Sequence, residues 1–287
     1  MAKFIPDINT KRWVIISSQR SNRPNQVKDP KSSEIIEKDG YNYNEGCPFC
    51  LTHESETPPE ISRVVDPQDL NKWLVRVVPN KYPITDVHEV IIHSPDHMKD
   101  IAEFDAGHIE TLMKVYRARY NALSTKGAVM IFNNKGKVSG ESLVHPHSQV
   151  VVIPKQINLD VLTLEPVHNI IHENTHFITF CPDFSQWPFE TWIAKKECLT
   201  EGHKGNCLFG AINDIQLTAL SHALQSVIKK LTNKFPDLSY NFYIYPYGCW
   251  YLRIIPRLTD RAGFELGTGL SVNTVDPSEA ARELSGI

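Results

Sequence analysis

The chain contains, at residues 142–153, the stretch SLVHPHSQVVVI. Side chains alternate across a β-strand, so this stretch predicts a strand that carries His145, His147 and Gln149 on one face. Pro146 lacks a backbone donor and therefore belongs at the entrance or the edge of that strand. A lone His-x-His pair is more often two surface histidines beside a buried strand. Three polar side chains that converge at the entrance of an apolar strand favour a functional site instead.

The elements around this strand follow a pattern that occurs twice. In each copy, strands precede an amphipathic helix and two further strands follow it. The strands of the first copy are predicted at 74–78, 89–93, 128–132 and 147–153, with a helix around 109–120. Those of the second are predicted at 176–180, 190–194, 241–245 and 250–255, with a helix at 214–231.

The two copies also match in sequence position. Glu89–Ile92 aligns with Glu190–Ile193, and the prolines that close the last strands, Pro154 and Pro256, lie 102 residues apart. We therefore predict an α+β fold made of two copies of one unit, each an antiparallel sheet with a helix packed on it.

The predicted halves are residues 1–160 and 161–287. The second half has Tyr247 and Cys249 where the first has His145 and His147. This difference predicts an active N-terminal half and a degenerate, structural C-terminal half.

Composition narrows the class of protein. The 287 residues carry a formal net charge of −3, which argues against a chain that coats nucleic acid by charge. No apolar run approaches the roughly 20 residues that cross a bilayer, and the N-terminus lacks the hydrophobic stretch of a signal peptide. We therefore expect a cytoplasmic protein without nucleic-acid or membrane partners. The first 70 residues are rich in turn formers and predict loops with one early strand at 13–16.

Two further motifs suggest ligands. Residues 132–142, FNNKGKVSGES, form a polar loop whose two glycines let backbone amides turn toward a phosphate. By itself such a loop is more often an ordinary connection between strands. Cys47 and Cys50 have the spacing of a zinc-binding pair, for which His97 and His145 are candidate partners. A redox dithiol is the alternative, but no thioredoxin-like βαβ pattern surrounds the pair.

Six short motifs, taken together, resemble those of the galactose-1-phosphate uridylyltransferase family of the histidine-triad superfamily, including its ADP-glucose phosphorylase-like members. The resemblance runs over nearly the whole chain, and the pieces occur in the family's order. They are RSNRP at 20–24, CPFC at 47–50, PNKYP at 79–83, SPDH at 94–97, HPHSQ at 145–149 and AGFELGTG at 262–269. The family fold is a duplicated histidine-triad unit, usually a homodimer, which agrees with the repeat.

The resemblance implies a role for each matching residue. His147 corresponds to the nucleophile that holds a covalent nucleotidyl group, and Gln149 to the residue that hydrogen-bonds the phosphoryl oxygens. The resemblance further implies nucleotide, phosphate or sugar contacts for Arg20, Arg23, Asn80, Asn134, Gly140, Ser142, Phe264 and Glu265. It implies one structural Zn²⁺ held by Cys47, Cys50, His97 and His145.

The same resemblance leaves the substrates open. The first expectation is a uridylyltransferase that exchanges UMP between UDP-glucose and a hexose 1-phosphate such as galactose 1-phosphate. The second is an adenylyltransferase or phosphorylase that moves AMP from ADP-glucose, adenylyl sulfate or a dinucleotide to phosphate. The third is a non-catalytic nucleotide-binding protein. Some relatives carry a second metal in the second half, but this chain lacks a second Cys-x-x-Cys pair, so we predict none there.

Overall fold

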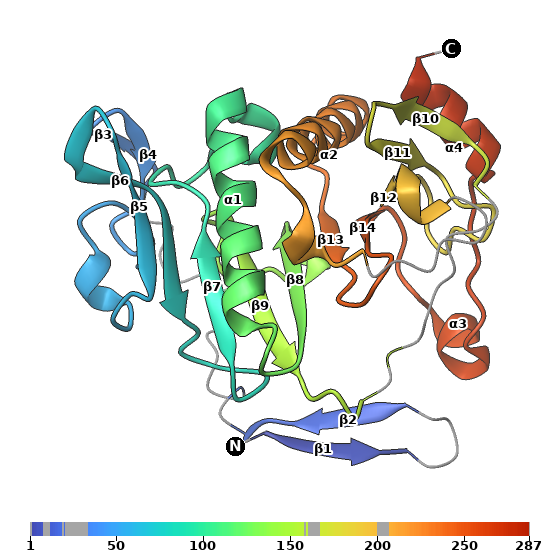
Figure 1. Ribbon diagram of the computed structural model, residues 1–287, viewed down its shortest axis with the longest axis horizontal. Helices are drawn as coiled ribbons and strands as arrows, with labels where there is room; N and C mark the ends of the chain where they lie inside the picture. The colour runs from blue at the N-terminus through green and yellow to red at the C-terminus, as the bar shows by residue number, and fades with distance from the viewer. Residues whose placement is uncertain are drawn as a thin grey trace. The chain divides into compact units, whose positions relative to one another are not determined.

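The computed structural model describes residues 2–7, 12–18, 20, 34–157, 159, 167–199 and 207–286. Within them the chain divides into two compact units (Figure 1). The first unit comprises residues 1–100, 115–131 and 142–160, and the second comprises 101–114, 132–141 and 161–287. The predicted boundary after residue 160 stays a prediction, since this division assigns two short segments before it to the second unit.

The first unit is built on an antiparallel sheet. Its strands follow the order β5-β6-β7-β9-β8. They are β5 (Ser62–Asp66), β6 (Asp69–Pro79), β7 (His88–Ile92), β9 (His147–Ile153) and β8 (Ala128–Lys135), of which the last extends into the second unit. The helix α1 (Ala106–Leu123) connects β7 to β8, and its C-terminal part contacts β7 and β9.

The second unit repeats this order with different strands. Its sheet runs β10-β11-β12-β14-β13, and the helix α2 (Asp214–Lys234) connects β12 to β13. The strands are β10 (Ile170–Glu173), β11 (Phe177–Phe180), β12 (Thr191–Lys195), β13 (Tyr240–Ile244) and β14 (Tyr251–Pro256). The predicted α+β class, with helices packed on antiparallel sheets, is therefore confirmed, and so is the duplication of the unit.

The main helix of the second unit, α2, forms for a local reason. α2 begins at a capping box, in which the Asn213 side chain accepts from the backbone of Gln216 and the Gln216 side chain accepts from Asn213. Its leucines at 217, 220, 224 and 231 are fully buried and pack toward β11 and β12. Burial of each such side chain contributes about 1.5–3 kcal/mol, so this face holds the helix on the sheet.

The N-terminal 70 residues contain more strands than the expected single one. In addition to β2 (Trp13–Ile16), the structure has β1 (Lys3–Pro6), β3 (Ile36–Lys38) and β4 (Tyr41–Tyr43), as well as β5. β1 pairs with β2, and β3 pairs with β4, each in a sheet of two strands among the described residues. Such short, exposed pairs carry no alternation of buried and exposed residues, so their sequences do not reveal them.

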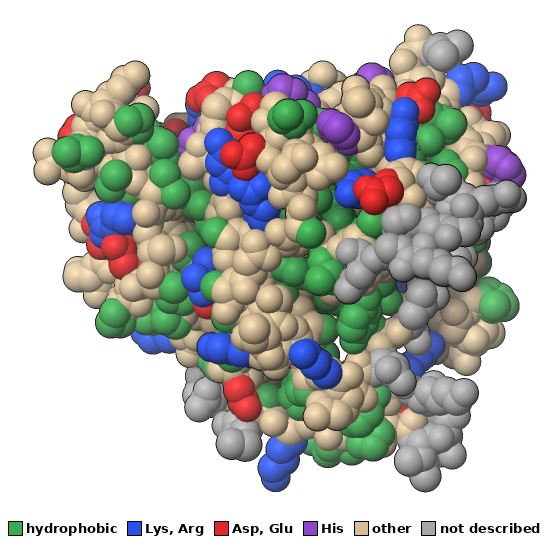
Figure 2. Space-filling model, viewed as in Figure 1, with side chains coloured by type: hydrophobic (Ala, Val, Ile, Leu, Met, Phe, Trp, Pro, Cys, Tyr) green, Lys and Arg blue, Asp and Glu red, His purple; other side chains and the backbone are tan. Residues whose placement is uncertain are grey.

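The surface is mixed in character. On the face shown in Figure 2, basic and acidic side chains are interspersed, in keeping with the small net charge. Val14 and Ile16 on β2 are about half exposed. Two short helices, α3 (Gly263–Thr268) and α4 (Pro277–Ser285), complete the second unit. Among the described residues, no helix has both the length and the apolar composition needed to cross a membrane.

Candidate functional site

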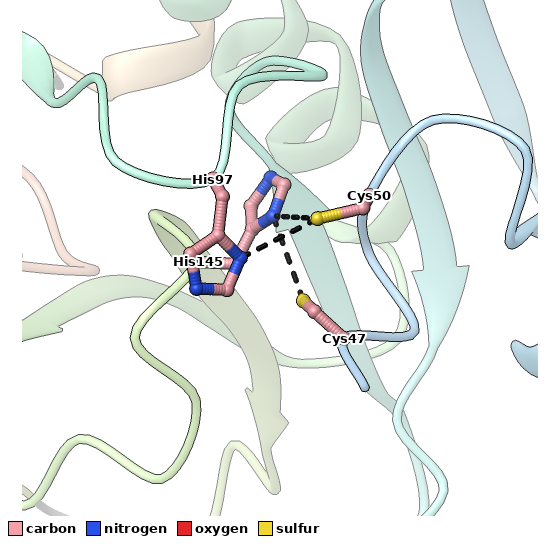
Figure 3. Close-up of side chains that lie close together, drawn as sticks. All are labelled: Cys47, Cys50, His97 and His145. Atoms are coloured by element: carbon pink, nitrogen blue, oxygen red, sulfur yellow. Dashed lines mark hydrogen bonds between the residues drawn. The ribbon is translucent and has the colours of Figure 1, made fainter. Parts of the chain in front are cut away.

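Four buried side chains of the first unit converge on one point. Cys47 and Cys50 come from the turn after β4, His97 from the loop after β7, and His145 from the residues just before β9 (Figure 3). Their ligand atoms all lie within 4.8 Å of one another. The structure thus brings together the four residues that the resemblance groups as metal ligands.

The distances between these atoms fit a tetrahedral metal. The Cys50 Sγ atom lies 3.4 Å from His97 Nδ1 and 3.7 Å from His145 Nδ1, and Cys47 Sγ lies 3.6 Å from His145 Nδ1. Zinc bonds of ordinary length to sulfur and nitrogen, at a tetrahedral angle, separate S and N by about 3.5 Å. Two thiolates and two imidazoles are also the donor set that zinc prefers. This buried group could therefore hold a metal ion.

The protein orients the ligand atoms before any metal binds. Backbone N–H groups of Phe49 and Asn44 donate to the sulfurs of Cys47 and Cys50, respectively, each at 3.4 Å. The hydrogen bond between the two cysteines, with those from His145 and His97, lowers the pKa of the Cys50 thiol. The same bond to Cys50, together with burial, raises the pKa of the Cys47 thiol.

The His145 ring is oriented by a bond to the backbone, and the loop of His97 is held by a neighbouring carboxylate. The His145 Nε2 group donates to the carbonyl of Ser94 at 2.8 Å, which leaves the lone pair of Nδ1 toward the sulfurs. The loop that carries His97 is held by Asp96, whose carboxylate accepts from the backbone of Asn42, Met98 and Lys99. Burial alone would raise the pKa of Asp96, but these bonds outweigh it and lower the pKa.

His147 lies two residues beyond His145, at the start of β9. Its Nδ1 group donates to the carbonyl of His145 at 2.9 Å, because a carbonyl can only accept. The neutral ring therefore carries its lone pair on Nε2. The ring of Phe49 packs edge-on against His147, with centroids 5.5 Å apart. The turn at residues 47–50 thus supplies two side chains of the ligand cluster and, through Phe49, also contacts His147.

A cavity of about 340 Å³ opens at His147, within the first unit. Its polar lining includes Asn80, Ser142 and Gln149, all predicted site residues. Its apolar lining includes Phe49, Val78, Val90 and Leu143. A concave, mostly apolar wall with a few convergent polar groups is typical of small-molecule sites.

The alternation of side chains explains why these residues meet. Val90 on β7 pairs with Gln149 on β9, and Val78 on β6 pairs with Val90, so all three side chains share the cavity face of the sheet. Ser148 points to the opposite face, where Tyr116 and His93 contact it. The predicted shared face of His147 and Gln149 is therefore present, and a register slip by one residue would bury both under α1.

The remaining predicted site residues lie elsewhere or serve local structure. Arg20 belongs to the first unit and donates to the carbonyl of Tyr82, a cavity residue, at 3.2 Å. Arg23 lies outside the described residues. Asn134 and Gly140 belong to the second unit, as do Phe264 and Glu265 on α3.

These second-unit residues have clear local environments. The Asn134 amide oxygen accepts from Asn241 at 2.7 Å. Gly140 has φ +84°, a left-handed conformation that favours glycine. Phe264 is more than half exposed, and the Glu265 carboxylate accepts from the backbone of Ala262 at the start of α3.

Sequence reasoning missed two contributors. Phe49 lies inside the Cys-x-x-Cys turn and forms the cavity wall beside His147. His88, the first residue of β7, lies buried against Gln149. The alternation that groups His147 with Gln149 also places His88 on the face of Val90, but this is visible only once β7 is known to pair with β9.

Comparison with known proteins gives relatives of two named activities. A family model described as the N-terminal domain of DUF4931, a domain of unknown function, matches residues 25–156. ADP-glucose phosphorylase of Arabidopsis thaliana is 28% identical, over 95% of this chain and 89% of the relative. Galactose-1-phosphate uridylyltransferase of Thermotoga maritima is 26% identical, over 96% and 95%.

The fold is similar to a solved structure over its full length. The crystal structure of the Arabidopsis thaliana ADP-glucose phosphorylase with bound ADP-glucose aligns with a TM-score of 0.72 and 26% identity, covering 100% of this chain and 99% of the other. The resemblance deduced from the six sequence pieces is therefore confirmed by homologues that extend over almost the whole chain.

Proposed function

We propose that this chain, a homologue of the galactose-1-phosphate uridylyltransferases and of ADP-glucose phosphorylase, is a nucleotidyltransferase that works through a covalent intermediate on His147. One observation carries the proposal. His147 donates through Nδ1 to a backbone carbonyl, which keeps the lone pair on Nε2, and the residue lines the cavity beside Gln149. This is the geometry that an imidazole nucleophile requires.

The reaction consists of two displacements. His147 Nε2 attacks the α-phosphorus of a nucleotide sugar, forms an N–P bond and breaks the bond from that phosphorus to the oxygen of the sugar phosphate, which leaves. A phosphate oxygen of the acceptor then attacks the same phosphorus and restores the imidazole. Because the first product leaves before the acceptor enters, the kinetics are ping-pong.

Neighbouring residues support the charge that develops on the phosphoryl group. Gln149 donates amide hydrogens to the phosphoryl oxygens, and Ser142 and Asn80 line the same cavity. The apolar wall accommodates a nucleobase. The resemblance assigns further nucleotide or sugar contacts to Arg20, Arg23, Asn134, Gly140, Phe264 and Glu265, and these roles remain proposals.

The ligand cluster beside the nucleophile has a structural role in this proposal. Cys47, Cys50, His97 and His145 hold one Zn²⁺, whose positive charge stabilises both cysteines as thiolates. Four protein ligands leave no open position for substrate. The cluster instead fixes the residue two positions before His147 and the turn that carries Phe49. The second half holds no second metal in this proposal.

Two donors are supported by the relatives. The first is UDP-glucose, with a hexose 1-phosphate such as galactose 1-phosphate as acceptor, as in the named uridylyltransferases. The second is ADP-glucose, with phosphate as acceptor, and the ADP-glucose phosphorylase that covers 95% of this chain favours it. Both donors share the α-phosphorus that His147 attacks.

The test is intact-protein mass spectrometry after separate incubation with UDP-glucose and ADP-glucose. We expect a mass increase of one UMP or one AMP on the wild-type chain and none on His147→Ala, which should still bind nucleotide. The adduct identifies the donor, and its decay on adding galactose 1-phosphate or phosphate identifies the acceptor. An adduct that persists in His147→Ala removes His147 as nucleophile. A wild-type chain that binds both nucleotides without forming an adduct is a binding protein, and the proposed function then fails.

A further inference from the structure

A buried histidine lies directly behind Gln149. His88 is the first residue of β7, is 4% exposed and does not line the cavity. Its ring Nε2 atom lies 3.0 Å from the side-chain oxygen of Gln149 on the neighbouring strand. All of these residues belong to the first unit.

The other ring nitrogen of His88 determines where its proton resides. The backbone N–H of Ile84 donates to His88 Nδ1 at 3.0 Å. A backbone N–H can only donate, so Nδ1 must present a lone pair and carries no hydrogen. A neutral ring then carries its single hydrogen on Nε2. A doubly protonated ring would place two donors against each other and lose the bond to Ile84.

This assignment fixes the orientation of the Gln149 amide. Because Nε2 carries the hydrogen, it donates to the Gln149 oxygen, and the NH₂ group of Gln149 is the part left to face a ligand in the cavity. Without a donor at this position, the amide can turn by half a rotation. Its oxygen would then face the phosphoryl oxygens, which repel it.

Asn80 completes the arrangement. Its side-chain oxygen accepts from the backbone of Tyr82 at 2.7 Å, so its NH₂ group lies on the side of His88, 3.2 Å from Nε2. Since Nε2 carries a hydrogen, it does not accept from Asn80. The hydrogen on Nε2 is therefore donated to Gln149 and not to Asn80, which lines the same cavity as Gln149.

We propose that His88 is a positioning residue that holds the Gln149 amide with its NH₂ group toward the phosphoryl group. This inference rests on the proposed function, because it assigns Gln149 to the phosphoryl oxygens. His88 touches no reacting atom, and it acts by donating from Nε2 while Ile84 keeps Nδ1 unprotonated.

Two substitutions separate this role from a merely structural one. His88→Asn retains an acceptor near the Nδ1 position, for Ile84, but has no donor at the Nε2 position. His88→Gln places an NH₂ donor near the Nε2 position, for Gln149, but loses the acceptor for Ile84. We expect His88→Asn to lower kcat for nucleotidyl transfer about 10- to 100-fold, with a much smaller change in KM for the nucleotide sugar. His88→Gln should retain activity within a few-fold of wild type.

The proposal would be overturned if His88→Asn were the active variant and His88→Gln the impaired one. If His88 serves only to anchor the turn at Ile84, His88→Asn stays active and His88→Gln loses both activity and melting temperature. A double-mutant cycle with Gln149→Ala provides a second criterion, since His88→Asn should cause little further loss once Gln149 is absent. Losses that multiply across the two sites show that His88 acts independently of Gln149 and contradict the inference.

A direct measurement of the tautomer keeps this inference distinguishable from the proposed function. In protein labelled with ¹⁵N-histidine, the His88 ring should show a protonated Nε2 and an unprotonated Nδ1 at neutral pH. His88→Gln identifies its signals by their loss. A protonated Nδ1 overturns the inference even if the wild-type chain forms its nucleotidyl adduct. Absence of the adduct with the expected tautomer present overturns the proposed function and, with it, the assigned purpose of His88.

Discussion

His147 acts as a nucleophile only if one ring nitrogen is occupied by a donated hydrogen bond and the other lies toward the substrate. The bond from its Nδ1 to the carbonyl of His145 meets the first condition. His145 itself is held by Ser94 and by the two cysteine sulfurs. At the scale of residues, the two histidines of this motif therefore bind the backbone through opposite ring nitrogens, Nε2 in His145 and Nδ1 in His147.

The cysteine turn gives a prediction at the same scale. Cys47→Ser should lose the bound metal and lower the free energy of unfolding by about 4 kcal/mol or more, because loss of a structural metal is among the largest single-residue effects. Elemental analysis and thermal denaturation measure the two outcomes. Cys181→Ser is the control, since Cys181 is also buried but lies in the second unit, and it should keep its metal. A Cys47→Ser protein with unchanged metal content and melting temperature contradicts the assignment.

At the scale of elements, α1 is joined to the sheet of the first unit by a buried polar network. Tyr116 contacts the Ser148 hydroxyl and His93 Nε2, and His93 Nε2 also lies 2.8 Å from the Ser148 oxygen. Burial raises the pKa of Tyr116 well above its ordinary value, so the phenol remains neutral. The network fixes the back of β9 at the position between His147 and Gln149.

Removal of the phenol oxygen should therefore affect stability and leave the chemistry intact. Tyr116→Phe should lower the free energy of unfolding by about 1–2 kcal/mol, because Ser148 and His93 lose a buried partner. Urea denaturation measures this loss, and the nucleotidyl adduct should form as in wild type. An unchanged unfolding free energy would show that the network does not stabilise the sheet.

The edge of the same sheet gives a pH-dependent prediction. Glu60 accepts from Arg63 on β5 and from Arg76 on β6, and the bond from Arg63 is the main cause that lowers the pKa of Glu60 below its ordinary 4.5. A carboxylate with a lowered folded-state pKa stabilises the fold above its unfolded pKa and loses that contribution as the pH falls through the folded value.

Comparison with an isosteric amide isolates this contribution. Glu60→Gln should be less stable than wild type at pH 7, by no more than about 1 kcal/mol because Glu60 is partly exposed. Below the folded-state pKa of Glu60 the wild-type side chain is neutral as well, and the difference should vanish. Unfolding free energies measured between pH 7 and pH 3 test this, and a constant difference across that range would exclude the ion pair as its cause.

At the scale of the whole molecule, the two units share one strand order, and in the described part of the chain the buried group of two cysteines and two histidines lies in the first. In the second unit, Trp192 and Tyr251 stack with ring centroids 4.0 Å apart, and Tyr251 stacks on Tyr245 at 4.9 Å. These aromatic side chains belong to a hydrophobic core cluster of the second unit. A duplicated fold can retain one copy for chemistry and the other for stability.

The resemblance to a usually dimeric family predicts the state of the assembled protein. The mass of one chain is 32.7 kDa, and light scattering after size-exclusion chromatography should give twice that mass. The measurement is repeated across a range of concentrations, because association follows mass action. A single-chain mass at every concentration would contradict the homodimer that the resemblance predicts.

The pattern of the fold and the face that carries the candidate site could be predicted from the sequence. Alternation placed His147 and Gln149 on one face, and β9 has the predicted bounds of residues 147–153. The order of elements along the chain, with strands before each of α1 and α2 and two strands after it, follows from the hydrophobic periodicity of each half. These features are local, because they depend on the spacing of side chains along one strand or helix.

Tertiary structure alone decided the contacts between residues distant in sequence. Cys47 and His145 meet across 98 positions, and His88 and Gln149 across 61. Spacing along the chain cannot specify such pairs, because they depend on which strands are neighbours and in what register. By contrast, the tautomers of His88 and His147 depend on backbone groups only four and two residues away, which the turn before β7 and the start of β9 bring to the rings.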